Sequence, residues 1–150
     1  MDNKELTKLA VEARENSYSP YSNFMVGAAL ITKGGRVFTG CNIENSGYSS
    51  TVCAERTAFF KAVSEGEMSF EKIAVAGWAK DAKQQAEAFP CGVCRQVMRE
   101  FCEPDIFKVL VVKNESGDYT EYTLGELLPF GFGPENLELQ KLVRVIFREI

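Results

Sequence analysis

The sequence predicts a single α/β domain, and three observations point to it. The chain has 150 residues, a length that suits one hydrophobic core. Its composition, 45% hydrophobic and 25% charged, is that of an ordinary globular protein. Strand-like and helix-like patterns alternate through the middle of the chain. This alternation predicts a βαβαβ core whose later strands run parallel.

Three segments have a helical pattern. The first carries apolar residues at helical spacing and should end before the turn-forming residues 17–20. The second follows Ser50 or Thr51, either of which can cap it, and Gly66 lies near its expected end. In the third, two cysteines and several apolar residues share one face. The predicted helices cover residues 2–16, residue 50 or 51 to about residue 64, and residues 91–102.

Five segments have the composition of β-strands. Lys33, Gly34 and Gly35 separate the first two, which is typical of a β-hairpin. The fourth has the continuous apolar pattern of a buried strand, and the fifth is expected at a sheet edge. The polar residues 79–88 are expected at the surface. The predicted strands cover residues 26–32, 36–43, 72–77, 107–112 and 119–123.

Charge and hydropathy exclude several classes of protein. The net charge is −4 and no run is rich in Lys or Arg, which argues against a polynucleotide as partner but not against a single nucleoside. No apolar stretch approaches the roughly 18–20 residues that span a bilayer, so no membrane association is expected. The acidic, helix-patterned first 16 residues do not resemble a signal peptide. We therefore expect a cytoplasmic protein.

Five cysteines are an odd number and fit a disulfide framework poorly. Cys91 and Cys94, spaced as Cys-x-x-Cys, fit a redox pair, half of a zinc site or two buried small residues. Cys53 adds a third thiol, and both clusters lie at predicted helix starts, where partial positive charge stabilises thiolates. If the two helices follow neighbouring strands of one sheet, the three thiolates meet at its edge. Three ligands with one open position are typical of catalytic zinc, and the chain has no histidine.

Three charged residues follow these cysteines closely. Glu55 cannot easily join the same tetrahedral shell as Cys53, but it can reach a water at the open position, as a proton shuttle must. The alternative is a solvent-facing glutamate in the first turn of a helix. Arg56 and Arg95 can donate to thiolate sulfur and draw negative charge from the metal. The alternative for each arginine is a surface ion pair.

These residues carry a resemblance. Cys53-Ala54-Glu55, followed by Pro90-Cys91-Gly92-Val93-Cys94, resembles the cytidine deaminase family. The surrounding sequence is similar to the small, homotetrameric, zinc-dependent nucleoside branch of that family, over roughly residues 5–138. The further matching stretches are Tyr18–Ser22, Phe24, Val26–Leu30, Gly40–Asn45, Arg95–Val97, Leu127–Pro129 and Phe132–Pro134.

The resemblance implies a three-layer α/β/α fold with a mixed five-stranded sheet. It also implies one Zn²⁺ per subunit, bound by Cys53, Cys91 and Cys94, with Glu55 as the proton shuttle.

Six further residues match substrate-binding positions of the family. Asn42 and Glu44 match a pair that holds the ribose hydroxyls, a task that suits an amide and a carboxylate. The resemblance places Phe24 in the base pocket and the Ala54 backbone against the pyrimidine ring. Tyr48 and Phe132 match aromatic residues that each subunit contributes to a neighbour's active site. From the pattern alone, Phe24 and Phe132 would be core residues, and Tyr48 would be an aromatic residue in a loop. The alternative role for the polar pair is a turn at the end of a strand, which would explain Asn42 but not Glu44.

The function implied is hydrolytic deamination of cytidine and deoxycytidine to uridine and deoxyuridine, with release of ammonia, in pyrimidine salvage. The alternatives are a deaminase of a cytosine-containing nucleoside antibiotic, a polynucleotide-editing deaminase and a non-catalytic zinc-binding module. The last of these needs a closed fourth ligand, which Cys41 or Cys102 would have to supply. The expected partners are a nucleoside substrate and further copies of the chain in a homotetramer with shared active sites.

Two features depart from the family pattern. Phe89 precedes the Pro-Cys-Gly run, where the family usually has a small hydroxyl residue, so a contact of that hydroxyl would be absent or replaced. Residues 139–150 extend the deaminase-like domain of residues 1–138, with apolar residues on one helical face. Cys41 and Cys102 match no ligand position and are expected to be small buried thiols.

Overall fold

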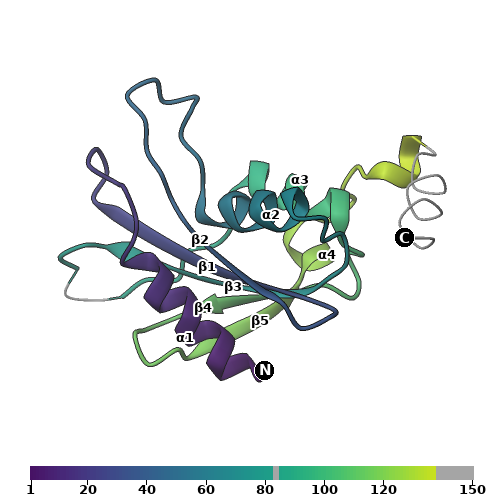
Figure 1. The fold of residues 1–150 in the computed structure, drawn as a ribbon, viewed down its shortest axis with the longest axis horizontal. Helices are drawn as coiled ribbons and strands as arrows, with labels where there is room; N and C mark the ends of the chain where they lie inside the picture. Colours follow the sequence, from purple (N-terminus) through teal and green to yellow (C-terminus); the bar gives the residue numbers. More distant parts are fainter. Residues whose placement is uncertain (83–84, 138–150) are drawn as a thin grey trace.

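A computed structural model describes residues 1–82 and 85–137 of the chain. A single sheet forms the middle layer, with the first helix of the chain on one face and the second and third helices on the other (Figure 1). The three-layer α/β/α architecture is therefore confirmed. In chain order the elements are α1 (Asn3–Arg14), β1 (Phe24–Thr32), β2 (Val37–Cys41), α2 (Ala54–Ser64), β3 (Phe70–Ala79), α3 (Gly92–Phe101), β4 (Lys108–Val112), β5 (Tyr119–Thr123), α4 (Leu124–Leu127) and the short 3₁₀ helix η1 (Pro134–Leu137).

The sheet is mixed and has the order β2-β1-β3-β4-β5. Strand β1 pairs antiparallel with both β2 and β3, and β5 pairs antiparallel with β4. Only β3 and β4 run parallel among the described strands, so the parallel part is smaller than the predicted βαβαβ core. The expectation that α2 and α3 follow neighbouring strands is wrong, because β1 lies between β2 and β3.

Two apolar clusters, one on each face, hold the layers together. The central strands carry buried residues on both faces, which explains their continuous apolar sequences. The first cluster lies under α2 and α3 and includes Phe59, Met98 and Phe107, each at most 1% exposed. The second lies under α1 and includes Leu6, Ala10 and Leu110. Covering both faces in this way leaves the ends of the strands for function.

Helix α1 begins and ends as the sequence predicts. Asp2 accepts a hydrogen bond from the Glu5 amide, and the Glu5 side chain accepts from the Asp2 amide, which forms a capping box. Arg14 in its last turn is buried and donates to the carbonyls of Trp78 and Ala79 at the end of β3. Helix α1 therefore ties one face of the sheet to the end of β3.

Helix α2 begins differently from the prediction, whereas helix α3 begins where it was predicted, at Cys91. The residue at the N-cap of α2 is Cys53, not Ser50 or Thr51, and the N-cap of α3 is Cys91. Neither cysteine makes a side-chain capping hydrogen bond. Helix α2 ends as expected before Gly66, whose φ of 91° lies in the left-handed region that favours glycine. Both helices thus present a sulfur, rather than a capping oxygen, at their N-termini.

The C-terminal part contains elements that the sequence analysis did not predict. Helix α4 continues directly from β5, with Thr123 and Glu126 forming a second capping box. The described chain then ends after η1, so the prediction for residues 139–150 lies outside the described residues. No helix within residues 1–82 and 85–137 is long and apolar enough to cross a membrane.

The close approach of β2 to α2 depends on Gly40. A Cβ at this position would collide with the Ala54 carbonyl oxygen and would lie 2.7 Å from the Ala58 amide nitrogen. Both contacts are to helix backbone, which cannot rotate away. We therefore expect Gly40→Ala to destabilise the fold by about 3 kcal/mol or more, the upper range for overpacking.

Thermal unfolding measures this prediction, with an expected fall in Tm of about 6–12 °C for a chain of this length. Gly34→Ala is the matched control, because a Cβ there meets only the Thr32 hydroxyl at 3.8 Å. Equal melting temperatures for the two variants would show that β2 and α2 can separate at little cost.

Candidate active site

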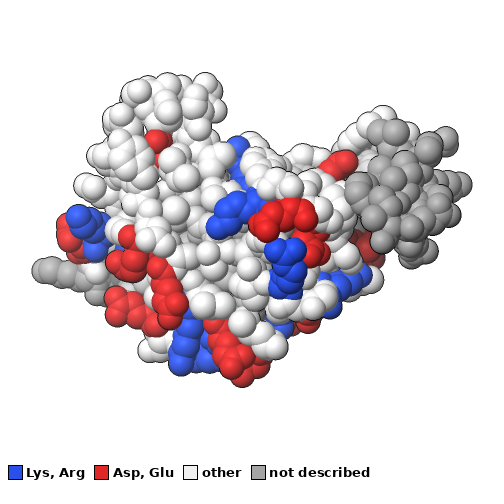
Figure 2. All heavy atoms as spheres, viewed as in Figure 1, with Lys and Arg blue, Asp and Glu red and all other residues white. Residues whose placement is uncertain are grey.

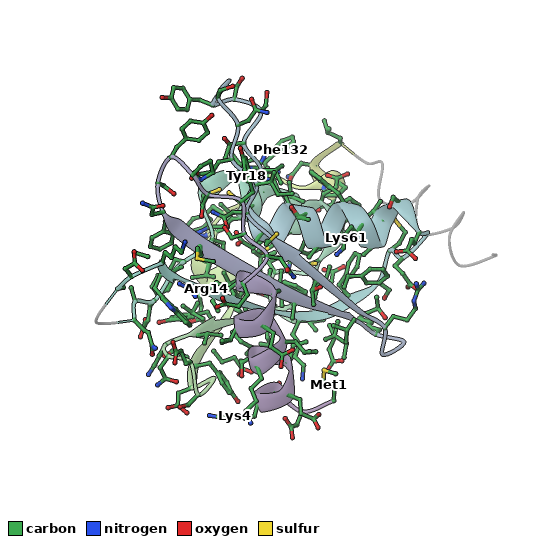
Figure 3. The ribbon with its side chains drawn as sticks, turned by 60° about the vertical axis from the view of Figure 1, so that its left-hand side comes forward. Met1, Lys4, Arg14, Tyr18, Lys61 and Phe132 are labelled. Carbon is green, nitrogen blue, oxygen red and sulfur yellow. The ribbon has the colours of Figure 1, made fainter. Side chains whose placement is uncertain are left out.

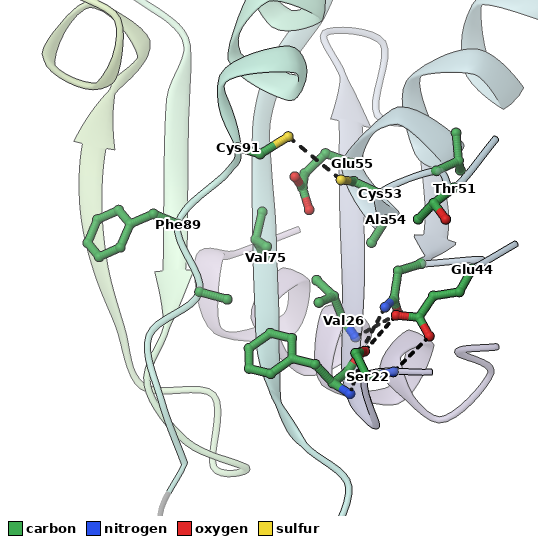
Figure 4. Close-up of a pocket in the computed structure, with 14 residues that line it drawn as sticks. Ser22, Val26, Glu44, Thr51, Cys53, Ala54, Glu55, Val75, Phe89 and Cys91 are labelled. Atoms are coloured by element: carbon green, nitrogen blue, oxygen red, sulfur yellow. Dashed lines mark hydrogen bonds between the residues drawn. The ribbon is translucent and has the colours of Figure 1, made fainter. Parts of the chain in front are cut away.

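Three cysteine sulfurs converge where α2 and α3 begin. Cys53 and Cys91 occupy the two N-cap positions, and Cys94 lies in the first turn of α3. Their ligand atoms all lie within 4.8 Å of one another, and the sulfurs of Cys53 and Cys91 are 3.7 Å apart (Figure 4). The predicted thiol cluster therefore forms, although β1 separates the strands that lead to the two helices.

The cluster fits one zinc ion. Tetrahedral zinc with Zn–S bonds of about 2.3 Å keeps two sulfurs about 3.8 Å apart, close to the Cys53–Cys91 distance. Cys41 and Cys102 do not belong to the cluster, which among the described residues contains three cysteines. The expectation that Cys41 is buried is wrong, because it is half-buried and donates to the Asn16 carbonyl, whereas Cys102 is buried as expected. The described chain thus offers three sulfur ligands and no fourth.

The thiols have strongly unequal acidities without a metal. The pKa of Cys53 is lowered to about 5, chiefly because it accepts a hydrogen bond from Cys94 and further because of Arg56. The pKa of Cys94 is raised by its hydrogen bond to Cys53 and by burial. Cys53 is therefore a thiolate near neutral pH, ready to bind a cation.

Glu55 lies in the first turn of α2 and points into the same space. Its side chain is 3% exposed, so the alternative of a solvent-facing glutamate is wrong. Burial, with the charge of Cys53 as a further cause, raises the pKa of Glu55 to about 7. A carboxyl with this pKa can both accept and return a proton near neutral pH, which general acid–base catalysis requires.

The two arginines have different partners. Arg56 donates to the Cys53 sulfur at 3.4 Å and is therefore not a surface ion pair. Arg95 donates to the carbonyls of Pro90, at 2.6 Å, and Leu127, at 2.5 Å. The direct contact with sulfur that we expected is thus found for Arg56, whereas Arg95 fixes the backbone immediately before Cys91.

Cys53, Cys91 and Glu55 lie at one end of a cavity of about 240 Å³. An apolar wall, which we define as Phe24, Val26, Val75 and Ala88, also lines it, with Val26 and Val75 between Cys53 and Ser22 (Figure 4). The other end of the cavity is polar, with Ser22 and Glu44 (Figure 4), and Asn42, which donates to the Phe24 carbonyl, lines the cavity as well. An apolar slot between polar ends suits a flat heterocycle that carries a hydroxylated substituent.

Asn42 and Glu44 also hold the loop before β1. The Asn42 amide donates to the Phe24 carbonyl at 2.8 Å and accepts from the Val26 amide at 2.9 Å, and it accepts from Ser17 as well. The Glu44 carboxylate accepts from the amides of Tyr21 and Ser22 and from the Ser22 hydroxyl. The Ser22 hydroxyl is the main reason that the pKa of Glu44 is lowered. Both side chains are therefore held rigidly at the cavity.

The predicted site residues divide into two groups. Phe24, Asn42, Glu44 and Ala54 line the cavity together with Cys53, Glu55 and Cys91. Tyr48 and Phe132 do not line it and are 79% and 57% exposed. Figure 3 shows Phe132 and Tyr18 at the end of the molecule opposite Met1 and Lys4.

Sequence reasoning missed several lining residues. The sequence analysis predicted no role in the site for Ser22, Val75 or Ala88, although Ser22 belongs to a stretch that resembles the cytidine deaminase family. Val75 has only the pattern of a buried strand, and Ala88 only that of a polar surface segment. Phe89, which departs from the family pattern, turns its ring away from Cys53 and Glu55 (Figure 4). The ring packs edge-to-face on Tyr122, with the two ring centroids 5.4 Å apart.

Comparisons with known proteins agree with this geometry. A family model described as "Cytidine and deoxycytidylate deaminase zinc-binding region" matches residues 1–111. The cytidine deaminase of Sporosarcina psychrophila is 48% identical over 91% of this chain and 96% of its own. That of Halalkalibacterium halodurans is 49% identical over 91% of this chain and 98% of its own.

Solved structures give the same result. The crystal structure of cytidine deaminase from Burkholderia pseudomallei has a TM-score of 0.78 and 45% identity, and the match covers 88% of this chain and all of that one. The structure from Mycobacterium tuberculosis has a TM-score of 0.72 and 33% identity, over 89% of this chain and 98% of that one. Since the matched region contains the three cysteines and Glu55, and since such similar relatives cover nearly the whole chain, this chain belongs to the cytidine deaminase family.

Proposed function

We propose that the chain catalyses hydrolytic deamination of cytidine and deoxycytidine to uridine and deoxyuridine, a reaction of pyrimidine salvage. One observation carries the proposal. A buried carboxyl with a pKa of about 7 lies beside three clustered thiols, at the end of a cavity that suits a nucleoside. The relatives and the solved structures that this chain resembles are cytidine deaminases.

In this proposal Cys53, Cys91 and Cys94 hold one zinc ion. Bound there, the ion supplies a Lewis acid that lowers the pKa of a water molecule and orients it. Arg56, which donates to the Cys53 sulfur, withdraws part of the negative charge of the thiolates. Arg95 holds the Pro90 carbonyl and so fixes the position of Cys91.

Glu55 moves the protons of the reaction. It accepts a proton from the attacking water as a bond forms between oxygen and C4 of the base, and it delivers a proton to N3. It then takes the proton of the new C4 hydroxyl and delivers it to the amino group as the C4–N bond breaks and the C4=O bond forms, so that one water is consumed and one ammonia leaves. Burial favours the neutral form of Glu55, which makes the return of the proton efficient.

The polar end of the cavity receives the sugar. Glu44 uses three hydrogen bonds to hold its loop, which leaves acceptor capacity on the carboxylate for a ribose hydroxyl. One N–H of the Asn42 amide remains in addition to the bond to the Phe24 carbonyl. Phe24 and the Ala54 backbone flank the base.

The proposal includes a homotetramer with shared active sites. Tyr48 and Phe132 are exposed and lie outside the cavity of their own chain, which supports their insertion into the cavity of a neighbour. Tyr18, Tyr21 and Ile43 are also exposed, and the isolated bridge between Tyr18 and Ile43 joins the loops that carry them. An apolar surface of this kind suits an interface between copies of the chain.

The alternatives fit less well. A closed zinc module needs a fourth cysteine, and the described cluster has three. A polynucleotide-editing deaminase needs a basic surface, whereas charges of both signs are interspersed over the face in Figure 2. A nucleoside-antibiotic deaminase shares the zinc half of the site but not, by resemblance, the stretch from Asn42 to Asn45.

The direct test is ammonia release by purified protein from cytidine, deoxycytidine, cytosine and CMP. We expect turnover of the two nucleosides. Replacing Glu55 by Ala or by the isosteric Gln should lower kcat by about 10²–10⁴-fold or more, because proton transfer is lost. Zinc content, measured by elemental analysis, should stay at one ion per chain, because Glu55 is not a ligand. A variant that loses its zinc, or that keeps its activity, would contradict this role.

Arg56→Ala should weaken zinc retention or kcat/KM by about 10–100-fold, because the hydrogen bond to the Cys53 thiolate is lost. The matched control is Arg36→Ala, since Arg36 is 53% exposed, forms ion pairs with Glu65 and Glu67, lies over the Phe38 ring and does not line the cavity. We expect the control to change neither quantity. If the two variants behave alike in kinetics and in zinc affinity against a chelator, Arg56 has no role at the metal.

Asn42→Ala and Glu44→Ala should raise KM for cytidine by about 5- to 150-fold, which corresponds to 1–3 kcal/mol for a ribose hydroxyl left without its partner. Asn42→Ala should also lower Tm, because three internal hydrogen bonds are lost with the amide. Steady-state kinetics with Asn114→Ala, a distant turn variant, as control separates binding from a general loss of fold. Normal KM values in both site variants would place the sugar elsewhere.

A further inference from the structure

Gly77 lies in β3 behind the apolar wall of the cavity. It is buried and pairs with Val26 of β1. Because side chains alternate along a strand, Gly77 shares a face with Val75, which lines the cavity. Gly77 itself is not among the lining residues. The residues of the apolar wall therefore pack over Gly77, a position without a side chain.

A side chain at this position would meet three members of the wall at once. A Cβ would lie 2.7 Å from the Ala88 Cβ, 3.1 Å from a Val26 methyl and 3.2 Å from the edge of the Phe24 ring. All three distances are shorter than ordinary van der Waals contact. Three residues that line the cavity thus rest on the bare backbone of Gly77.

The neighbours differ in their freedom to move. The Ala88 methyl is fixed to its backbone, in the segment that leads through Pro90 to the ligand Cys91. Val26 is β-branched and stiff in its central strand. Phe24 is 37% exposed at the mouth of the cavity, and its ring can rotate. A methyl group at position 77 would consequently push the Phe24 ring towards the cavity or displace the segment at Ala88.

The backbone does not require glycine at this position. The glycines with φ in the left-handed region are Gly35, Gly66 and Gly117, whereas Gly77 lies in regular strand. Alanine is therefore compatible with the local conformation, and the restriction is one of space beside the cavity.

We propose that Gly77 is a positioning residue that determines specificity: by lacking a side chain it lets Phe24 and Ala88 lie back against β3 and so sets the width of the slot for the pyrimidine. The inference rests on the proposed function in one respect, namely that the base occupies the slot beside the apolar wall.

The first test is Gly77→Ala. We expect KM for cytidine to rise about tenfold, equivalent to about 1.4 kcal/mol of binding, with kcat nearly unchanged. The affinity for the product uridine, measured by titration calorimetry, should fall by a similar factor. Zinc content should stay at one ion per chain. This separation of KM from kcat is not expected from a general loss of fold.

The second test is rescue. Ala88→Gly removes the methyl that would lie 2.7 Å from the new Cβ, so Gly77→Ala/Ala88→Gly should recover most of the lost affinity. Ala88→Gly alone shows what that change does by itself, and Gly34→Ala, in the turn between β1 and β2, controls for replacing a glycine away from the cavity. Should Gly77→Ala fail to fold, Ala88→Val adds bulk to the same wall from the other side and should raise KM in the same way.

The outcomes are distinct. An unchanged KM and uridine affinity in Gly77→Ala, or an effect that Ala88→Gly does not relieve, overturns the inference, as does an unchanged KM in Ala88→Val. If the unaltered chain does not deaminate cytidine, the proposed function fails, while uridine binding still tests Gly77 independently.

Discussion

The meeting of two helix N-termini is the constraint on which the rest of the site depends. Helices α2 and α3 both start with a cysteine at the N-cap, where an oxygen side chain would ordinarily accept an amide hydrogen bond. Giving up that bond leaves free amides and the positive ends of two helix dipoles directed at the sulfurs. The energy lost in capping is offset by stabilisation of thiolates, and a bound cation would stabilise them further.

Burial then gives the neighbouring groups their chemistry. The same packing that places Cys53 and Cys94 together removes Glu55 from water, which raises the pKa of its carboxyl to about 7. Arg56 compensates the sulfur charge from one side, while Arg95 holds the backbone before Cys91 by bonding to two carbonyls. The close packing of α2 on β2 at Gly40 fixes the position of the N-terminus of α2, and with it the positions of Cys53, Glu55 and Arg56.

Much of this arrangement could be predicted from the sequence, because ligand spacing and helix starts are local properties. Such patterns predicted that the three cysteines cluster and where β5 begins and ends, and the structure agrees with both. The predicted N-cap of α2 was wrong because the usual preference for serine or threonine does not apply where a member of the cysteine cluster occupies that position. The position of β1 between β2 and β3 depends on long-range pairing. The partners of Arg95 and the space at Gly77 depend on residues that only the folded chain brings together.

X-ray absorption at the zinc edge of the purified protein tests the central claim most directly. The account predicts three sulfur ligands at about 2.3 Å and one lighter ligand at about 2.0–2.2 Å. Cys91→Ser should lower the sulfur count by one. Four sulfur ligands in the unaltered protein would show a closed structural site and contradict an active site built at the two helix N-termini.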